Sequence, residues 1–227
     1  MLFHCVAPLL MPGQVDPDHG RAGSEKSFTE VDGKLKLLFQ TIKTLSYMIE
    51  VRDPYTYIHQ ERVSTLAAVI AFEMGFPAEN IDTVRLAAAV HDIGKIRIPS
   101  EILNKPGKID EYEFGMIQTH PQVGFDILHK IEFLEPVAEI VLQHHERLNG
   151  SGYPLGTKRD RILLESKILA VADVVEAMIS HRPYRPALGV KAALKEISEN
   201  RDVLYDPSVV DAWIRLSRKR DWDAWSG

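Results

Sequence analysis

Apolar residues recur along most of the chain at the spacing of amphipathic helices, and no stretch of useful length alternates as a β-strand does. Pro54, Gly75 and Pro77 are stop signals between helical patterns, and Asn80 is a suitable N-cap for the next one. The pattern predicts an all-α fold, a single helical bundle. The expected helices cover about residues 28–51, 55–74, 80–90, 137–142, 164–179, 189–199 and 206–218, with shorter ones beginning near Ser100, Asp110 and His120.

Two of the expected helices end in apolar runs that lead directly into polar pairs. The run at residues 86–90 is apolar on every face, which is typical of a buried helix, and it leads into His91 and Asp92. The run at residues 137–142 leads into His144 and His145. Nitrogen and oxygen donors are therefore expected at similar depth in a helical core, as a metal site requires.

The helix expected at residues 164–179 is nearly all apolar on its inner side, with Asp173 as the one exception. An ionised carboxylate in such surroundings costs several kcal/mol unless a cation or hydrogen-bond donors compensate it. Taken alone, Asp173 fits a partner such as an arginine or a backbone group better than a metal ion. Taken alone, His91 fits an ordinary core histidine equally well.

Considered together, the donors favour a metal centre, because independent buried polar residues would rarely gather at the ends and inner faces of successive helices. Seven donors exceed the usual protein complement of one ion but suit two ions that share a carboxylate. Imidazoles and carboxylates without a thiolate favour Fe, Mn, Ni or Zn in an octahedral or near-octahedral site over a structural tetrahedral zinc. The seven are His59, His91, Asp92, His120, His144, His145 and Asp173.

Composition narrows the classes of partner. The chain is 45% hydrophobic and 26% charged with a formal net charge of −5, the balance of an ordinary globular protein. A nucleic-acid polymer is not an expected partner, because such binders carry an excess of Lys and Arg. Cys5 is the only cysteine, which excludes a disulfide framework and favours a reducing, cytoplasmic setting.

No run is long and apolar enough to predict a membrane span, and the apolar start at residues 1–11 lacks the features of a signal peptide. Pro and Gly among polar residues in the stretch that follows are typical of a linker. The predicted organisation is a flexible segment at residues 1–27, one domain at residues 28–220 and a short tail at residues 221–227.

Two long motifs carry a family resemblance. His91–Lys95 reads HDIGK and His144–Pro154 reads HHERLNGSGYP, and together they resemble the HD-GYP group of HD-domain phosphohydrolases. The resemblance implies a helical bundle with a metal centre that hydrolyses the bacterial second messenger cyclic di-GMP to linear pGpG, to GMP or to both. It covers nearly everything from about residue 30 to 215, including residues 52–56, 102–107, 172–173 and 182–185.

The resemblance also implies roles for the seven donors. Tyr55 stands where members with a third metal carry a glutamate, so a binuclear centre is expected, with Fe or Mn favoured and Ni or Zn also compatible. Asp92 would bridge the two ions, and the other ligands would divide between them, His59, His91 and Asp173 on one and His120, His144 and His145 on the other.

The same resemblance places Lys95 beside the reacting phosphate or the metal-bound water, and Arg182 and Arg185 on the substrate phosphates. The planar guanidinium of arginine suits bidentate phosphate binding, although without the resemblance a solvated turn would be the better explanation of the two arginines. Two positions besides Tyr55 depart from the family pattern. Asn149 replaces a common Asp, and His181 replaces the usual acidic residue before Arg182.

Gly152, Tyr153 and Pro154 form the tripeptide that gives the group its name. By resemblance, this loop borders the site, contacts the substrate and docks partners such as GGDEF-domain proteins. The alternative is a purely structural loop, in which glycine provides unusual backbone angles and the tyrosine packs on the domain.

These features predict a metal-dependent phosphodiesterase in which a metal-bridging hydroxide attacks phosphorus, with Asp92 and Lys95 as the catalytic residues. One alternative is hydrolysis of another cyclic dinucleotide or a simple nucleotide. A second is a non-catalytic sensor or adaptor that docks GGDEF-domain proteins. The intact ligand set argues against the second, because a receptor has no need of a binuclear centre.

Overall fold

The structure, a computed structural model, describes Thr41, Thr44 and residues 56–131, 134–181, 186–219 and 222. All of them belong to one structural unit, Phe39–Gly227. The helix expected at residues 28–51 lies outside the described residues, apart from Thr41 and Thr44, which are helical.

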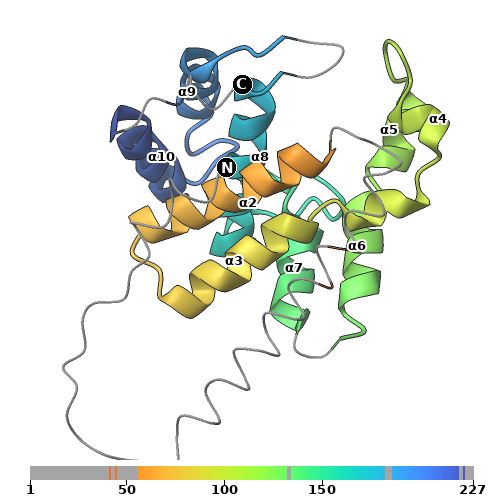
Figure 1. Ribbon diagram of the computed structural model, residues 1–227, viewed down its shortest axis with the longest axis horizontal. Coiled ribbons are helices and arrows are strands. Elements are labelled where there is room, and N and C mark those ends of the chain that lie inside the picture. Colours follow the sequence, from red (N-terminus) through yellow and green to blue (C-terminus); the bar gives the residue numbers. More distant parts are fainter. Residues whose placement is uncertain are drawn as a thin grey trace, which may run out of the picture. The chain divides into compact units, whose positions relative to one another are not determined.

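The described residues form α-helices with two short 3-10 helices, η2 (Ile93–Arg97) and η4 (Arg159–Arg161), and contain no β-strand (Figure 1). The all-α prediction is confirmed for this part of the chain, and no helix in it is both long enough and apolar enough to cross a membrane. The α-helices are α2 (Thr56–Glu73), α3 (Ala78–Val90), α4 (Ser100–Leu103), α5 (Glu111–Ile117), α6 (His120–Leu128), α7 (Glu135–Gln143), α8 (Leu164–Ile179), α9 (Val190–Glu199) and α10 (Pro207–Lys219).

Local signals set most of the helix boundaries. Asp110 and Glu113 form the predicted capping box at the start of α5, and Pro121 lies in the first turn of α6. One prediction was wrong: Asn80 does not cap α3, which begins two residues earlier. Pro77 is the N-cap instead, because its extended backbone turns its carbonyl toward the amides of Asn80 and Ile81, at 3.1 and 3.0 Å.

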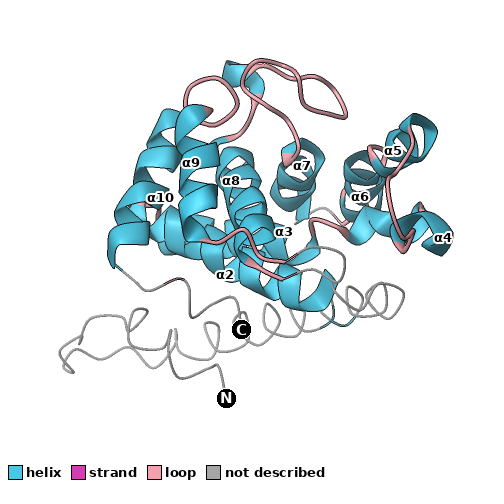
Figure 2. Ribbon diagram, turned by 90° about the horizontal axis from the view of Figure 1, so that it is seen from above, coloured by secondary structure: helices cyan, strands magenta, loops and turns pink. Residues whose placement is uncertain are grey.

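The helices pack around a central group made of α2, α3 and α8 (Figures 1 and 2). α2 packs against both α3 and α8, and α7 packs against α3. In both views α9 and α10 lie at one end of the bundle, beside α8, while α4 and α5 lie at the other. η2 follows α3 directly and packs on α6.

Apolar side chains from the central helices form the core. Leu66 and Ile70 of α2 and Ile168 and Leu169 of α8 are fully buried. The small alanines at positions 87–89 are also buried, which allows α3 to pack closely on α2 and on α7 together. The buried run predicted from this part of the sequence is confirmed.

Helix α8 departs from the sequence prediction in one respect. Asp173 is not the one polar residue on its inner side, because Ser166 and Glu176 are also buried, Glu176 with 2% of its surface exposed. Glu176 lies on the same face as Asp173, three residues further along the helix, and accepts hydrogen bonds from His59 and Ser180. Those donors compensate the burial of its carboxylate.

Trp222, which the sequence places in the C-terminal tail, is buried against α10. Its ring centroid lies 5.1 Å from that of Trp213, in an edge-to-face arrangement. Its Nε1 donates to the carbonyl of Leu216 at 3.2 Å.

Gly94 is the point of closest approach between η2 and α6. A Cβ added at Gly94 would lie 1.9 Å from the carbonyl oxygen of His120 and 2.6 Å from the amide nitrogen of Gly124. No other residue type fits without separating the two elements. The spacing between Asp92, just before η2, and His120, at the start of α6, therefore depends on this glycine.

We expect Gly94→Ala to destabilise the domain by about 1–3 kcal/mol, the usual effect of forcing atoms into a packed contact. Urea denaturation would measure the change in the free energy of unfolding. Gly115→Ala in α5 is the matched control, because a Cβ there meets nothing within 4 Å. It should leave stability unchanged or raise it by up to about 1 kcal/mol through better helix propensity. Equal stability for Gly94→Ala and wild type would contradict the prediction.

Candidate metal centre

Three of the predicted ligand histidines lie at helix ends and use the same hydrogen bond. His91 and His144 directly follow α3 and α7, and His120 follows the end of α5. In each, Nδ1 donates to a carbonyl three residues earlier, and since a carbonyl only accepts, Nε2 keeps a lone pair for a ligand. The acceptors are the oxygens of Ala88 for His91 (2.7 Å), Ile117 for His120 (2.7 Å) and Val141 for His144 (2.6 Å).

The free ends of these rings converge on Asp92. The Nε2 atoms of His120 and His144 are 3.3 Å apart. One carboxylate oxygen of Asp92 lies 3.4 Å from Nε2 of His91, and the other lies 3.5 Å from Nε2 of His120. Asp92 therefore faces two different groups of donors with its two oxygens, which is the arrangement a bridging carboxylate needs.

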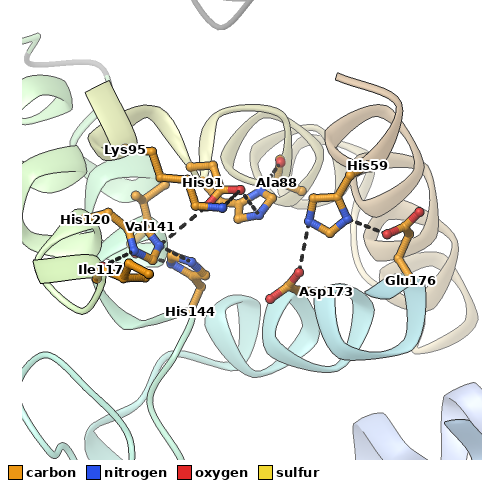
Figure 3. Close-up of polar contacts among 11 residues, drawn as sticks. His59, Ala88, His91, Lys95, Ile117, His120, Val141, His144, Asp173 and Glu176 are labelled. Carbon is orange, nitrogen blue, oxygen red and sulfur yellow. Dashed lines mark hydrogen bonds and ion pairs between the residues drawn. The ribbon is translucent and has the colours of Figure 1, made fainter. Parts of the chain in front are cut away.

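A second arm of the site is built between α2 and α8. His59 lies on α2, and its Nε2 is 3.1 Å from a carboxylate oxygen of Asp173 on α8. Its Nδ1 donates to the carboxylate of Glu176. The His59 ring thus lies between two carboxylates of one helix, as Figure 3 shows.

The seven predicted donors form three overlapping groups in which the candidate ligand atoms lie within 4.8 Å of one another. The structure therefore brings together every donor predicted from the sequence. The groups are His59, His91 and Asp173; His120, His144 and His145; and His91, Asp92 and His144. The first two groups have the same members as the two ligand sets that the family resemblance implies for two ions.

Burial keeps three of the imidazoles neutral. It lowers the pKa of His120 to about 4 and that of His145 to about 3, and it holds the pKa of His144 well below its ordinary value. Neutral rings at neutral pH have lone pairs available for coordination, so no proton needs to be removed from these three before an ion binds.

The carboxylates remain ionised despite their burial. Burial would raise the pKa of Asp92, but the charge of Lys95 above all holds it well below its usual range. Burial likewise opposes ionisation of Asp173, whose pKa is nevertheless kept low by its hydrogen bond with His59. Neutral imidazoles and ionised carboxylates are a donor set that suits divalent transition metals.

His59 behaves differently from these three histidines. Burial lowers its pKa, but the hydrogen bonds and charges of Asp173 and Glu176 outweigh burial and raise the pKa to about 9. At neutral pH a proton on His59 therefore balances part of the negative charge between α2 and α8. The site attracts positive charge at this point.

The helix dipoles reinforce this preference for positive charge. Helices α3 and α7 end at the cluster, so the partial negative charge of each C-terminus lies beside the donors. Lys95 of η2 is a cation beside the cluster, with Nζ 2.7 Å from Asp92 and 24% of its side chain exposed. The ammonium that was predicted to meet a phosphate is thus in contact with the predicted bridging carboxylate.

A protein-family model for the HD domain matches residues 43–209 of the chain. The chain belongs to the HD-domain family. Its curated relatives include a cyclic di-GMP phosphodiesterase of Thermotoga maritima, 41% identical over 86% of this chain and 53% of the relative. The response regulator RpfG of Xanthomonas campestris, named a cyclic di-GMP phosphodiesterase, is 42% identical over 78% of this chain and 47% of its own length.

A Vibrio cholerae relative, 3'3'-cGAMP-specific phosphodiesterase 3, is 37% identical over 70% of this chain and 35% of its own length. The chain thus spans about half or less of the length of these relatives. Among solved structures, the HDG"Y"P protein Bd1817 of Bdellovibrio bacteriovorus superposes with a TM-score of 0.58 over 70% of this chain and 51% of that protein, at 21% identity. The resemblance to the HD-GYP group is confirmed, and the solved structure supports the HD-domain fold.

In this HD domain the Gly-Tyr-Pro loop lies directly against the cluster. The Tyr153 ring is 4.6 Å from the His145 ring between centroids, and the Tyr153 amide donates to the His145 carbonyl at 3.3 Å. A Cβ at Gly152 would lie 2.4 Å from that carbonyl and 2.5 Å from the Arg147 amide. The glycine is needed here for close approach rather than for a positive φ. Pro154, the third member, is partly exposed.

Glu146 supports this loop and was not predicted as part of the site. Its buried carboxylate accepts hydrogen bonds from the amides of Leu155 at 2.8 Å and Thr157 at 2.9 Å. The burial argument applied to Asp173 could have identified it, because Glu146 follows two predicted buried histidines. Glu176 was missed as well, although its position three residues after Asp173 on α8 is a readable signal.

The structure describes some of the remaining predicted positions and not others. Arg182 and Arg185, like Tyr55, lie outside the described residues. The Oδ1 of Asn149 accepts from the amide of Ser151 at 3.0 Å, so the asparagine keeps the turn as predicted. The side chain of His181 is exposed, and its Nδ1 accepts from the amide of Ala187 at 3.3 Å.

We expect Glu146→Gln to loosen the loop, because an amide offers one carbonyl acceptor where the carboxylate uses both oxygens. Hydrogen exchange at the amides of Leu155 and Thr157 should become faster, and stability should fall by about 1–3 kcal/mol, the effect of an unsatisfied buried polar group. The matched control is Glu139→Gln on α7, which should leave both amides protected. Unchanged exchange in Glu146→Gln would show that the carboxylate does not hold the loop.

Proposed function

We propose that this HD domain is a metal-dependent phosphodiesterase that acts on a cyclic dinucleotide, with cyclic di-GMP as the first candidate. The observation that carries the proposal is the convergence of seven donors in the bundle, with Asp92 placed between two groups of them. The relatives named cyclic di-GMP phosphodiesterases support the substrate class. We assign the activity to residues 28–220.

The proposed ligands are the seven donors, divided between two ions as the resemblance implies. When bound, divalent transition cations would supply Lewis acidity at the phosphoryl oxygens and a coordinated water with a pKa near neutrality. The donor set favours Fe or Mn and is compatible with Ni or Zn. A cation held by His59 and Asp173 would take the place of the proton that His59 carries without it.

The other residues of the site position the substrate in this proposal. Lys95 holds the orientation of Asp92 through the 2.7 Å contact, and its partial exposure leaves the ammonium accessible to a phosphate oxygen. Arg182 and Arg185 are proposed to bind the substrate phosphates, and Gly152, Tyr153 and Pro154 to border the substrate beside His145. Docking of GGDEF-domain proteins on this loop stays a prediction.

A second candidate substrate is 3'3'-cGAMP, because several Vibrio cholerae relatives are named as specific for it, at 31–37% identity. The phosphodiester chemistry is the same for both substrates. Recognition of the bases decides between them, and the described part of the site consists mainly of groups that bind metal or phosphate.

Asp92→Ala should lower hydrolysis of cyclic di-GMP by more than about 100-fold, because changes to groups that merely support a ligand already cost 10–100-fold. The metal content per chain should fall in the same preparation. Asp160→Ala, which removes an exposed carboxylate on η4, is the control and should keep both the hydrolysis rate and the metal content. An Asp92→Ala protein with full metal content and near wild-type turnover would exclude Asp92 as a ligand.

Turnover of cyclic di-GMP, 3'3'-cGAMP and a base-free phosphodiester by anaerobically purified, metal-loaded protein should distinguish the substrates. We expect hydrolysis of cyclic di-GMP, with chromatography showing pGpG, GMP or both, and loss of activity on removal of the metal by a chelator. Preferred hydrolysis of 3'3'-cGAMP would support the second candidate. Bound metal without hydrolysis of either dinucleotide would overturn the proposed substrate class.

A further inference from the structure

We propose that Glu176 is a positioning residue that selectively supports one of the two ions, by orienting His59 through its Nδ1. Ser180 and Arg62 complete the support by holding Glu176 in turn. The inference deepens the proposed function and rests on it. Glu176, Ser180 and Arg62 lie outside the predicted ligands and the predicted substrate contacts.

The starting observation is a difference among the ligand histidines. His91, His120 and His144 each donate Nδ1–H to a backbone carbonyl. His59 instead donates Nδ1–H to the side chain of Glu176. Figure 3 shows the contrast, with the His59 ring between Asp173 and Glu176.

Helix position explains the difference. The last turn of a helix has carbonyls without intrahelical partners, and the three histidines at helix ends use those carbonyls. His59 lies in the first turn of α2, where the amides lack partners and the carbonyls are already engaged. Its Nδ1 therefore has no spare backbone acceptor, and a side chain from the neighbouring helix takes that role.

The hydrogen bonds that hold Glu176 form a chain from Arg62 through Ser180. Ser180 Oγ donates to one carboxylate oxygen at 2.5 Å, and the other oxygen accepts from His59. Arg62 Nη1 lies 3.0 Å from Ser180 Oγ. A hydroxyl has one hydrogen, which Ser180 gives to Glu176, so its oxygen must accept from Arg62. The chain of donors runs from Arg62 through Ser180 to Glu176.

The location of Glu176 favours a positioning role over a merely structural one. It is 2% exposed on a helix face that is otherwise largely apolar, where an apolar side chain would pack without the cost of desolvating a charge. Its partner His59 contacts Asp173 through the opposite ring nitrogen. A carboxylate on Nδ1 fixes the tautomer that leaves Nε2 for a ligand and makes that nitrogen more basic.

The consequence is an asymmetry between the two donor groups. The group of His120, His144 and His145 includes two rings that are oriented by backbone carbonyls, which no side-chain substitution removes. The group of His59, His91 and Asp173 depends on Glu176 for one of its rings. Loss of Glu176 should therefore weaken the binding of one ion and leave the binding of the other unchanged.

The test compares Mn²⁺ binding to wild type, Glu176→Ala and Glu176→Gln, by titration and by metal content after dialysis. Wild type should retain roughly two ions per chain and Glu176→Ala roughly one. Glu176→Gln keeps an acceptor for Nδ1–H without the charge, so it should retain both ions, with one bound about 10–100-fold more weakly. Glu165→Gln, the same change in the first turn of α8, is the control and should match wild type.

Two further variants separate positioning from folding. Ser180→Ala leaves the carboxylate in place but removes its donor. It should weaken the binding of the same single ion by less than Glu176→Ala does. In His59→Ala, adding Glu176→Ala should cause little further loss of metal, because both changes act on one ion. If Glu176→Ala does not fold, as judged by circular dichroism, Ser180→Ala and Glu176→Gln decide the question.

Failure of this inference is distinguishable from failure of the proposed function. A wild type that binds no metal would overturn the proposed function, and this inference with it. Two ions in wild type, with folded Glu176→Gln and Ser180→Ala binding both at wild-type affinity, would overturn the positioning role alone. Equal weakening of both ions in those variants would also overturn it, because the effect would then not be selective.

Discussion

The site depends on how buried helix ends satisfy their last carbonyls. Helices α3, α5 and α7 each leave a carbonyl in the last turn that needs a donor, and a histidine Nδ1–H supplies it in every case. One hydrogen bond thus satisfies the backbone, fixes the tautomer and directs Nε2 inward. The packing that brings the ends of α3 and α7 together therefore also assembles the donors of His91, His120 and His144.

Charge places a second constraint on the same core. The carboxylates of Asp92 and Asp173 stay ionised in surroundings that oppose ionisation, because Lys95 and His59 lie against them. Such buried charges are a weak source of stability, and apolar residues of similar size would often stabilise a core as well or better. Their presence beside the C-terminal ends of two helices is better explained by a cationic ligand than by folding.

Much of this arrangement could be predicted from sequence, because its signals are local. The bounds of α8, the capping box before α5 and the buried run before His91 follow from periodicity and end residues. What could not be predicted depends on tertiary contacts. Sequence does not show that Gly94 and Gly152 face another backbone at a distance that excludes a Cβ, nor that Glu176 lies opposite His59 rather than another residue.

The two arms of the centre therefore depend on different features of the fold. Rings oriented by their own helix end move with that helix, so their geometry survives changes in distant side chains. His59 lies on α2 and the two carboxylates that contact it lie on α8, so the geometry of that arm follows the packing of α2 against α8. A change in the buried apolar residues of those helices, for example Leu66 of α2 or Leu169 of α8, would act on this arm without touching a donor. The apolar core thus sets the geometry of the donors on one side of the site, while backbone hydrogen bonds set it on the other.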